Sequence, residues 1–207
     1  MKRSLMAEIG AGRTNQKART ERAIVEACLE LIRRRQSVTM PEVAKVAKVS
    51  EATAYRYFPD LASLLSTSLS GDWPTPKEAL APVEASNDPI ERVTFATRFL
   101  LQGVADRESV VRTMIASTIT QPGLSGRARP GIRFGLIEYA LAPFASAMDP
   151  ELLTQLRRSL SVVMSAEALF SLTDLSGLTT EDAIESLTLT AQALTAWALA
   201  SKDEVPR

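Results

Sequence analysis

Side chains able to recognise nucleic acid lie close together between residues 50 and 57. Glu51 can accept a hydrogen bond from a cytosine amino group, while Ala52 and the methyl group of Thr53 can contact thymine methyl groups. Hydrogen-bond donors for phosphates or base edges follow directly along the chain, and these are Tyr55, Arg56 and Tyr57. These residue types at this spacing predict a DNA-reading surface.

Two short helices around a tight turn, over residues 39–58, are expected to position this surface. Thr39 is expected to cap a first helix that begins near Met40. Ser50 is expected to cap a second helix from residue 51 to about 58, which Pro59 ends because proline disfavours helical geometry in the preceding residue. Two helices around three turn residues indicate a helix-turn-helix, whose second helix enters the major groove of DNA.

A helical hairpin with a purely structural role is the alternative for this segment, with Tyr55, Tyr57 and Phe58 all in a core. We expect Phe58 to be buried. The two tyrosines are expected to face DNA, because they neighbour Thr53 and Arg56 on a face too polar for a core. A preceding amphipathic helix, from residue 20 to about 35, supplies the support, and Cys28 in its apolar stripe reads as an inert core thiol.

Charge is distributed unevenly along the chain. Residues 1–60 contain twelve Lys and Arg against seven Asp and Glu, and the remaining residues contain twelve against seventeen. This asymmetry indicates a cationic N-terminal surface suited to phosphate. Residues 1–17 are expected to form a flexible basic arm, in which Lys17 contacts DNA; an ordinary disordered terminus is the alternative.

Composition argues against catalysis. The 207 residues contain no histidine and one cysteine, so histidine-based triads, histidine-ligated metals and intramolecular disulfides are excluded. We expect no enzyme activity and no cofactor. No apolar signal segment or membrane span is expected, which favours a cytoplasmic protein with no membrane partner.

The run V-A-x-x-A-x-V-S-x-x-T-x-Y-R-Y-F-P-D, residues 43–60, resembles the TetR family of bacterial transcriptional regulators. The resemblance extends over about residues 18–65 and implies a homodimer on a near-palindromic DNA operator. It also implies that positions 51 and 52 set sequence preference. The contacts it implies to the DNA backbone or to thymine methyl groups come from Thr39, Ser50, Thr53, Tyr55 and Tyr57.

Three residues depart from the family pattern. Lys48 replaces the usual glycine of the turn, where a positive φ costs a non-glycine residue about 1 kcal/mol, so strain or a different turn is expected. Ala54 replaces a larger aliphatic residue beneath the second helix, and Leu61 replaces a lysine that commonly binds phosphate. These departures predict looser packing and the loss of one backbone contact.

The rest of the chain reads as further helices, with no strand-like alternation. Helices are expected over about 88–104, 108–120, 132–148, 149–172 and 179–201, with Pro143 dividing the third. We therefore predict an all-α protein with a three-helix helix-turn-helix domain over residues 18–65. Residues 66–207 are predicted to form a larger helical domain for effector binding and dimerisation.

Two surfaces are predicted in this larger domain. An apolar pocket for a small-molecule effector, implied by the resemblance, has as candidates Phe95, Phe99, Met114, Phe134, Glu138 and Tyr139. Trp73 could line such a pocket or cover the core. The last two helices are apolar around much of their surface and are expected to pair with a second copy through Leu156, Leu160, Val163, Leu187, Leu194 and Trp197.

The sequence therefore favours a DNA-binding regulator, most simply a repressor that responds to a ligand. Its expected partners are a double-stranded operator, an unidentified small-molecule effector and a second copy of the chain. The alternative is a dimeric, helical small-molecule-binding protein whose operator recognition Lys48, Ala54 and Leu61 have weakened.

Overall fold

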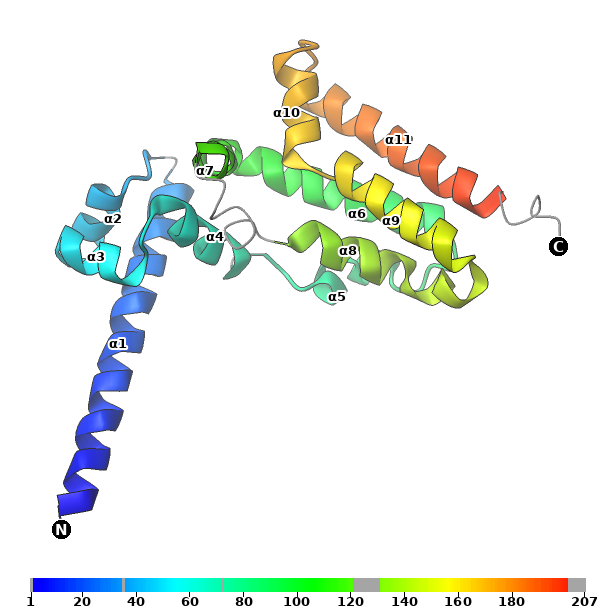
Figure 1. The fold of residues 1–207 in the computed structure, drawn as a ribbon. Helices are drawn as coiled ribbons and strands as arrows, with labels where there is room; N and C mark the ends of the chain where they lie inside the picture. Colours follow the sequence, from blue (N-terminus) through cyan, green and yellow to red (C-terminus); the bar gives the residue numbers. More distant parts are fainter. Residues whose placement is uncertain (1, 35, 72, 121–130, 201–207) are drawn as a thin grey trace. The chain divides into compact units, whose positions relative to one another are not determined.

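The computed structural model describes residues 2–34, 36–71, 73–120 and 131–200, and within these ranges the chain forms helices and no strand (Figure 1). The all-α prediction is confirmed. None of the helices in these ranges is both long enough and apolar enough to cross a membrane. The described residues divide into two compact units: the first contains the helices up to residue 71 and the segment from Ser109, and the second contains Trp73–Glu108 and the chain from Gly131 onward.

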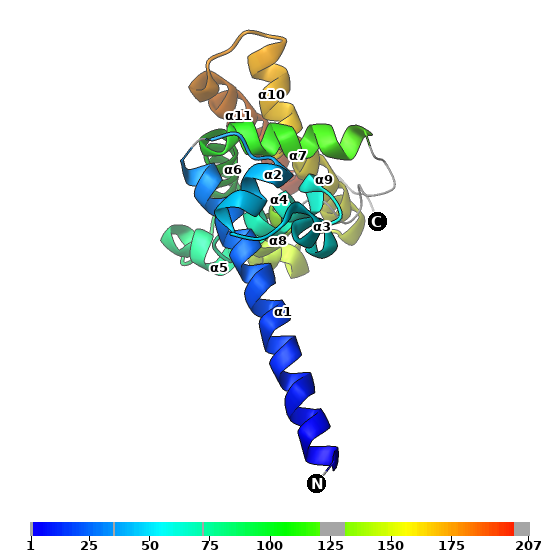
Figure 2. The same ribbon diagram turned by 90° about the vertical axis from the view of Figure 1, so that its left-hand side faces the viewer.

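The first unit is built around one long helix. Shorter helices gather at the C-terminal part of α1, as Figures 1 and 2 show, and α1 packs against both α2 and α4. The helices of this unit are α1 (Lys2–Arg33), α2 (Met40–Val46), α3 (Glu51–Tyr57), α4 (Leu61–Gly71) and α7 (Glu108–Thr120). Its buried side chains include Ile24, Cys28, Leu31, Val43, Ala44, Ala54, Phe58, Leu64 and Leu65. Cys28 is fully buried, and burial raises the pKa of its thiol, as expected of an inert core residue.

The N-terminal segment differs from its prediction. Residues 1–17 were expected to form a flexible arm, but α1 is helical from Lys2 (Figure 2). Most of this segment consists of good helix formers such as Leu5, Ala7 and Gln16, and the cost of Gly10 and Gly12 is about 1 kcal/mol each. The helix continues because its C-terminal half, anchored against α2 and α4, supplies a nucleus from which further turns propagate.

The second unit is a ring of four helices with shorter elements around it. In the ring, α6 packs on α8, α8 on α9, α9 on α11, and α11 back on α6. The elements are α5 (Pro76–Ala79), the 3₁₀ turns η1 (Ala81–Val83) and η3 (Ala142–Ala147), α6 (Pro89–Asp106), α8 (Ile132–Leu141), α9 (Pro150–Val163), α10 (Ala166–Asp174) and α11 (Thr180–Ala200). Leu80, Leu100, Leu141, Leu156 and Leu160 lie at the centre of its core.

Local capping fixes where several of these helices begin. The carboxylate of Asp88 accepts the amide of Ile90 at 2.8 Å, and Asp149 accepts the amides of two residues at the start of α9. An aspartate followed by proline is a sequence pattern typical of a helix start. The predicted division at Pro143 is also confirmed, since α8 ends at Leu141 and continues as the 3₁₀ turn η3.

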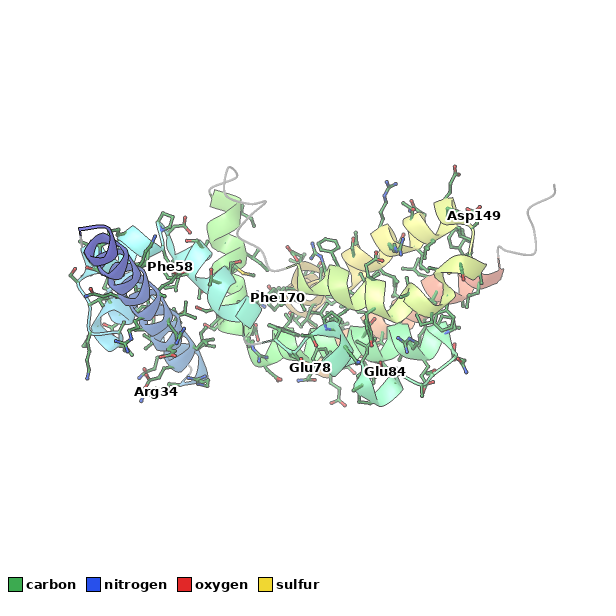
Figure 3. All side chains as sticks on the ribbon, turned by 90° about the horizontal axis from the view of Figure 1, so that it is seen from below. Arg34, Phe58, Glu78, Glu84, Asp149 and Phe170 are labelled. Atoms are coloured by element: carbon green, nitrogen blue, oxygen red, sulfur yellow. The ribbon has the colours of Figure 1, made fainter. Side chains whose placement is uncertain are left out.

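One arginine clamps three elements of the second unit together. Arg92 on α6 is 2% exposed and donates to the carbonyl oxygens of Val83 (2.9 Å), Glu84 (2.9 Å), Tyr139 (3.0 Å) and Ala140 (3.0 Å). These carbonyls lie at the C-terminal ends of η1 and α8, where backbone oxygens lack helical partners and a cation is favoured. Arg92 therefore holds α6, η1 and α8 in register; Glu84 is labelled in Figure 3.

Candidate nucleic-acid interface

The first helix of the predicted motif is α2, and its cap is the expected one. The Thr39 hydroxyl accepts the backbone amide of Glu42 at 3.4 Å, and Pro41 occupies the first turn, where its missing amide is not needed. Val43 and Ala44 are buried and join the motif to α1. Thr39 thus has a structural role as a cap, and its predicted contact with DNA stays a prediction.

The turn between α2 and α3 contains a residue in an unfavourable conformation. Lys48 has φ 56°, in the left-handed region that favours glycine. The backbone amides of Lys48 and Val49 donate to the carbonyls of Lys45 (3.2 Å) and Ala44 (3.0 Å), which closes α2 tightly. Of the two outcomes expected for Lys48, the structure shows a strained residue in an otherwise well-bonded turn.

The second helix, α3, begins at a cap formed by two hydroxyl side chains, those of Ser50 and Thr53. The Ser50 Oγ atom accepts the backbone amide of Thr53 at 3.1 Å and lies 2.8 Å from the Thr53 Oγ1 atom. Ser50 is exposed and Thr53 is half-buried. The pair fixes the first turn of α3, the turn in which residues 51–53 are predicted to face base edges.

The outer face of α3 is polar and exposed, whereas its inner face is buried. Glu51, Ala52, Tyr55 and Arg56 are exposed, and Tyr55 retains 47% of its surface. The predicted contact Tyr57 is half-buried, with the Arg56 guanidinium 5.5 Å from its ring centre. Ala54 and Phe58 are buried inside the unit, so the hairpin alternative holds only for Phe58, which is labelled in Figure 3.

Residues beside α3 complete this surface. Lys17 on α1 is exposed, as a phosphate contact requires. Leu61, at the position where the family commonly has lysine, is half-buried at the start of α4. Asp60, which the sequence indicated only as part of a stop signal, caps α4: its carboxylate accepts the amide of Ser63 at 2.7 Å. The spacing of an aspartate three residues before a serine amide is the signal that would have predicted this cap.

The residues predicted for an effector pocket are distributed over three helices of the two units. Phe95 and Phe99 lie on α6 in the second unit, whereas Met114 is buried on α7, which belongs to the first unit. Phe134 on α8 is 52% exposed. Helical periodicity shows which apolar residues of one helix share a face, but not which faces of different helices meet, so pattern alone could not distinguish pocket residues from core residues among these six.

The two polar candidates for the pocket have other partners. The Glu138 carboxylate accepts a hydrogen bond from Arg157 at 2.7 Å, joining α8 to α9. The Tyr139 hydroxyl donates to the Glu84 carboxylate at 2.9 Å, and this hydrogen bond raises the pKa of Tyr139. Both side chains therefore brace the outside of the ring.

A hollow of about 580 Å³ does include two of the predicted residues, Phe95 and Phe99. Its other lining residues are Trp73, Pro74, Arg98, Gln102, Gly103, Asp106, Arg107 and Ile184, and all of them belong to the second unit. We call this hollow the α6 cleft. Trp73 has both of the roles considered for it, because it packs against the core of the second unit and also lines this hollow. Gly103, near the C-terminal end of the amphipathic helix α6, was the unused signal that another group approaches this helix closely.

The residues predicted to pair with a second copy fall into two groups. Leu156, Leu160 and Leu187 are buried in the core of their own chain, so their side chains are not available to a partner. Val163 and Leu194 are half-buried, and Trp197 is 53% exposed. An apolar stripe does not reveal which side its own chain covers. Two exposed residues that the prediction omitted lie on the same helices, Val162 (68%) and Leu189 (54%).

The chain was compared with protein-family models, curated proteins and solved structures. A family model described as bacterial regulatory proteins, tetR family, matches residues 24–66, the segment that contains the C-terminal end of α1, all of α2 and α3, and about half of α4. No curated protein matches the chain.

A solved structure shares the fold of most of the chain. It is the crystal structure of a TetR transcriptional regulator from Rhodococcus sp. RHA1, with 20% sequence identity and a TM-score of 0.63, and the match covers 86% of this chain and 97% of that one. At this identity the likeness shows the fold alone. Together with the family model on the helix-turn-helix, it confirms the resemblance in the sequence: this chain carries the N-terminal domain of the TetR family of bacterial regulatory proteins.

Proposed function

We propose that this protein is a transcriptional repressor that binds a near-palindromic DNA operator as a homodimer and responds to a small-molecule effector. The observation that carries the proposal is the exposed polar face of α3, which combines Glu51, Tyr55 and Arg56 on a helix of the right length to enter a major groove. The family match at residues 24–66 supports the same role.

The packing of α3 supports a role in DNA recognition, because one face of the helix is buried in the first unit and the other face remains exposed. Ala54 and Phe58 fix the inner face in the first unit, and the Ser50–Thr53 pair fixes the first turn. The outer side chains therefore project from a backbone whose position is already determined. Pre-positioned donors lose less entropy on binding, which favours specific contacts over general electrostatic attraction.

Fluorescence anisotropy with the DNA upstream of the protein's own gene tests the proposal. We would titrate the purified full-length protein against that duplex and against a shuffled duplex, each at two salt concentrations. The informative variant is Tyr55→Phe, which removes one hydroxyl from the exposed face of α3. Tyr139→Phe is the matched control, because Tyr139 lies in the second unit and donates to Glu84.

Specific, tight binding to the upstream duplex is the expected result. Loss of one hydrogen bond to a charged phosphate costs about 1.5–3 kcal/mol, so Tyr55→Phe should weaken binding by about tenfold or more, while Tyr139→Phe should not. Equal binding to both duplexes, abolished by salt, would indicate phosphate attraction alone. The alternative of a small-molecule-binding protein with weakened operator recognition would then be favoured.

Exposed apolar residues support dimerisation through α9 and α11. Val162, Leu189 and Trp197 remain more than half exposed on these two helices, and covering such large apolar side chains with another chain is favourable. A two-fold dimer of this kind would set two reading helices about 34–36 Å apart, one turn of DNA. Leu189→Glu should yield monomers by light scattering, whereas Phe134→Glu, a change at an exposed residue of α8, should not; a monomeric wild-type protein would contradict this part of the proposal.

A further inference from the structure

The α6 cleft has the size and wall chemistry of a small-molecule site. Its volume of about 580 Å³ falls within the range of about 300–1,000 Å³ that ligand pockets occupy. The apolar wall comes from Trp73, Phe95, Phe99 and Ile184, and three of these aromatic and aliphatic side chains, Trp73, Phe95 and Phe99, are only partly buried by their own chain. Covering the remaining aromatic surface would be favourable by about 25 cal/mol per Å².

Trp73 is held against α6 by contacts that leave it in the cleft wall. Its indole ring lies so close to Gly103 that a Cβ atom at that position would clash with the ring. The Phe99 ring meets the indole nearly at right angles, 76° with centroids 5.9 Å apart. The Arg107 guanidinium lies 5.2 Å from the indole centre and donates to the Gly103 carbonyl at 3.2 Å. The aromatic wall is therefore already formed in the free chain.

The charges around the cleft are balanced. Arg98 forms a salt bridge with Glu185 of α11, which offsets one of the two guanidinium groups in the lining. Arg107 and Asp106 contribute one charge of each sign, and the Asp106 carboxylate accepts a hydrogen bond from Gln102 at 3.0 Å. An ionic ligand would lose its hydration without meeting an excess of the opposite charge, whereas an uncharged ligand avoids this cost.

We propose that the α6 cleft binds an uncharged, planar and mainly apolar small molecule, with its ring against the wall formed by Trp73, Phe95 and Phe99. Gln102 at the polar rim supplies a hydrogen-bonding partner for one polar group of the ligand. The inference that the cleft binds such a ligand does not require that the protein recognise DNA. Its further role, as the effector site of the repressor, rests on the function proposed above.

Calorimetry with three matched probes tests the class of ligand. The full-length protein, without DNA, would be titrated with 2-naphthol, 2-naphthoate and 2-naphthylmethylammonium, which share one ring system and differ in charge. The uncharged naphthol should bind at least threefold more tightly than either ion. Equal or tighter binding of an ion, or no binding of any probe, would overturn the proposal.

Substitutions in the cleft wall test the location. Trp73→Leu keeps an apolar side chain but removes the ring, and Gly103→Ala places a methyl group where the ring lies, so each should weaken naphthol binding at least tenfold. Phe134→Leu is the matched control, because it removes an exposed aromatic ring outside the cleft and should leave naphthol affinity unchanged. Unaltered affinity in a folded Trp73→Leu protein would place the ligand elsewhere.

The experiments distinguish failure of the proposed ligand site from failure of the proposed regulator function. Anisotropy with the operator duplex measures DNA binding through α3, and calorimetry with naphthol measures ligand binding in the α6 cleft. Each result can therefore be interpreted without the other. A protein that binds its upstream duplex but does not bind naphthol would contradict only the proposal that the α6 cleft is a ligand site. Naphthol binding by a protein with no operator preference would support the cleft and contradict the repressor.

Discussion

Replacing Arg92 by methionine should strongly destabilise the second unit. The guanidinium group donates to four carbonyl oxygens, and the bonds to Val83 and Ala140 lie in the buried interior. A buried carbonyl left without a partner costs about 1–3 kcal/mol, whereas the partly buried oxygens of Glu84 and Tyr139 can bond to water instead. The two buried groups together predict a loss of about 2–6 kcal/mol.

Urea denaturation followed by tryptophan emission measures this loss. Both tryptophans of the chain, Trp73 and Trp197, belong to the second unit, so their emission reports the unit that contains Arg92. Arg158→Met is the matched control, since Arg158 is an exposed residue of α9 in the same unit. A loss below about 1 kcal/mol, or one equal to that of the control, would refute the view that Arg92 holds the three elements together.

Three smaller changes test the local structure. Lys48→Gly should raise the free energy of unfolding by up to about 1 kcal/mol in urea denaturation followed by circular dichroism, because glycine adopts φ 56° without strain; Lys48→Ala keeps the strain and should give no gain. Ser50→Ala should cost about 1 kcal/mol and speed hydrogen exchange of the Thr53 amide about fivefold, and an unchanged rate would show that the cap does not hold α3. The backbone amide of Thr75 and then its hydroxyl donate to the Glu78 carboxylate and lower the pKa of Glu78, so the contribution of this capping box to stability is present above the unfolded pKa and is lost as the pH falls through the folded value. Glu78→Gln, which removes the titrating carboxyl, should flatten that acid-side dependence in pH-dependent melts, and an unchanged dependence would contradict it.

Helix starts could be predicted from sequence because their causes are local. Thr39, Ser50, Asp88 and Asp149 each cap the helix that follows, as a hydroxyl or carboxylate at that spacing predicts. The break at Pro143 follows from the same kind of reasoning, since one residue lacks the amide that a helix needs. The exposed outer face of α3 could also be predicted from the sequence, because its polar residues contrast with Ala54 and Phe58.

Contacts between distant segments could not be predicted in the same way. Leu156 and Leu160 were expected at a dimer interface, and only the ring of four helices shows that α8 and α11 of the same chain lie beside them. Trp73 and Gly103 are thirty positions apart, so no period relates them, yet their close approach forms one wall of the α6 cleft. Arg92 lies on an amphipathic helix, and its sequence context does not indicate that carbonyls of η1 and α8 surround its guanidinium group.

The order of packing in the ring also bears on how the protein is made. The contacts of α1, α2, α3 and α4 join neighbouring segments, so these helices can assemble while translation continues. The apolar side of α6 is covered by α11, which leaves the ribosome only after α7, α8, α9 and α10. Until then a nascent chain exposes this surface, which makes the interval before α11 emerges the period of greatest exposure to aggregation and to chaperones.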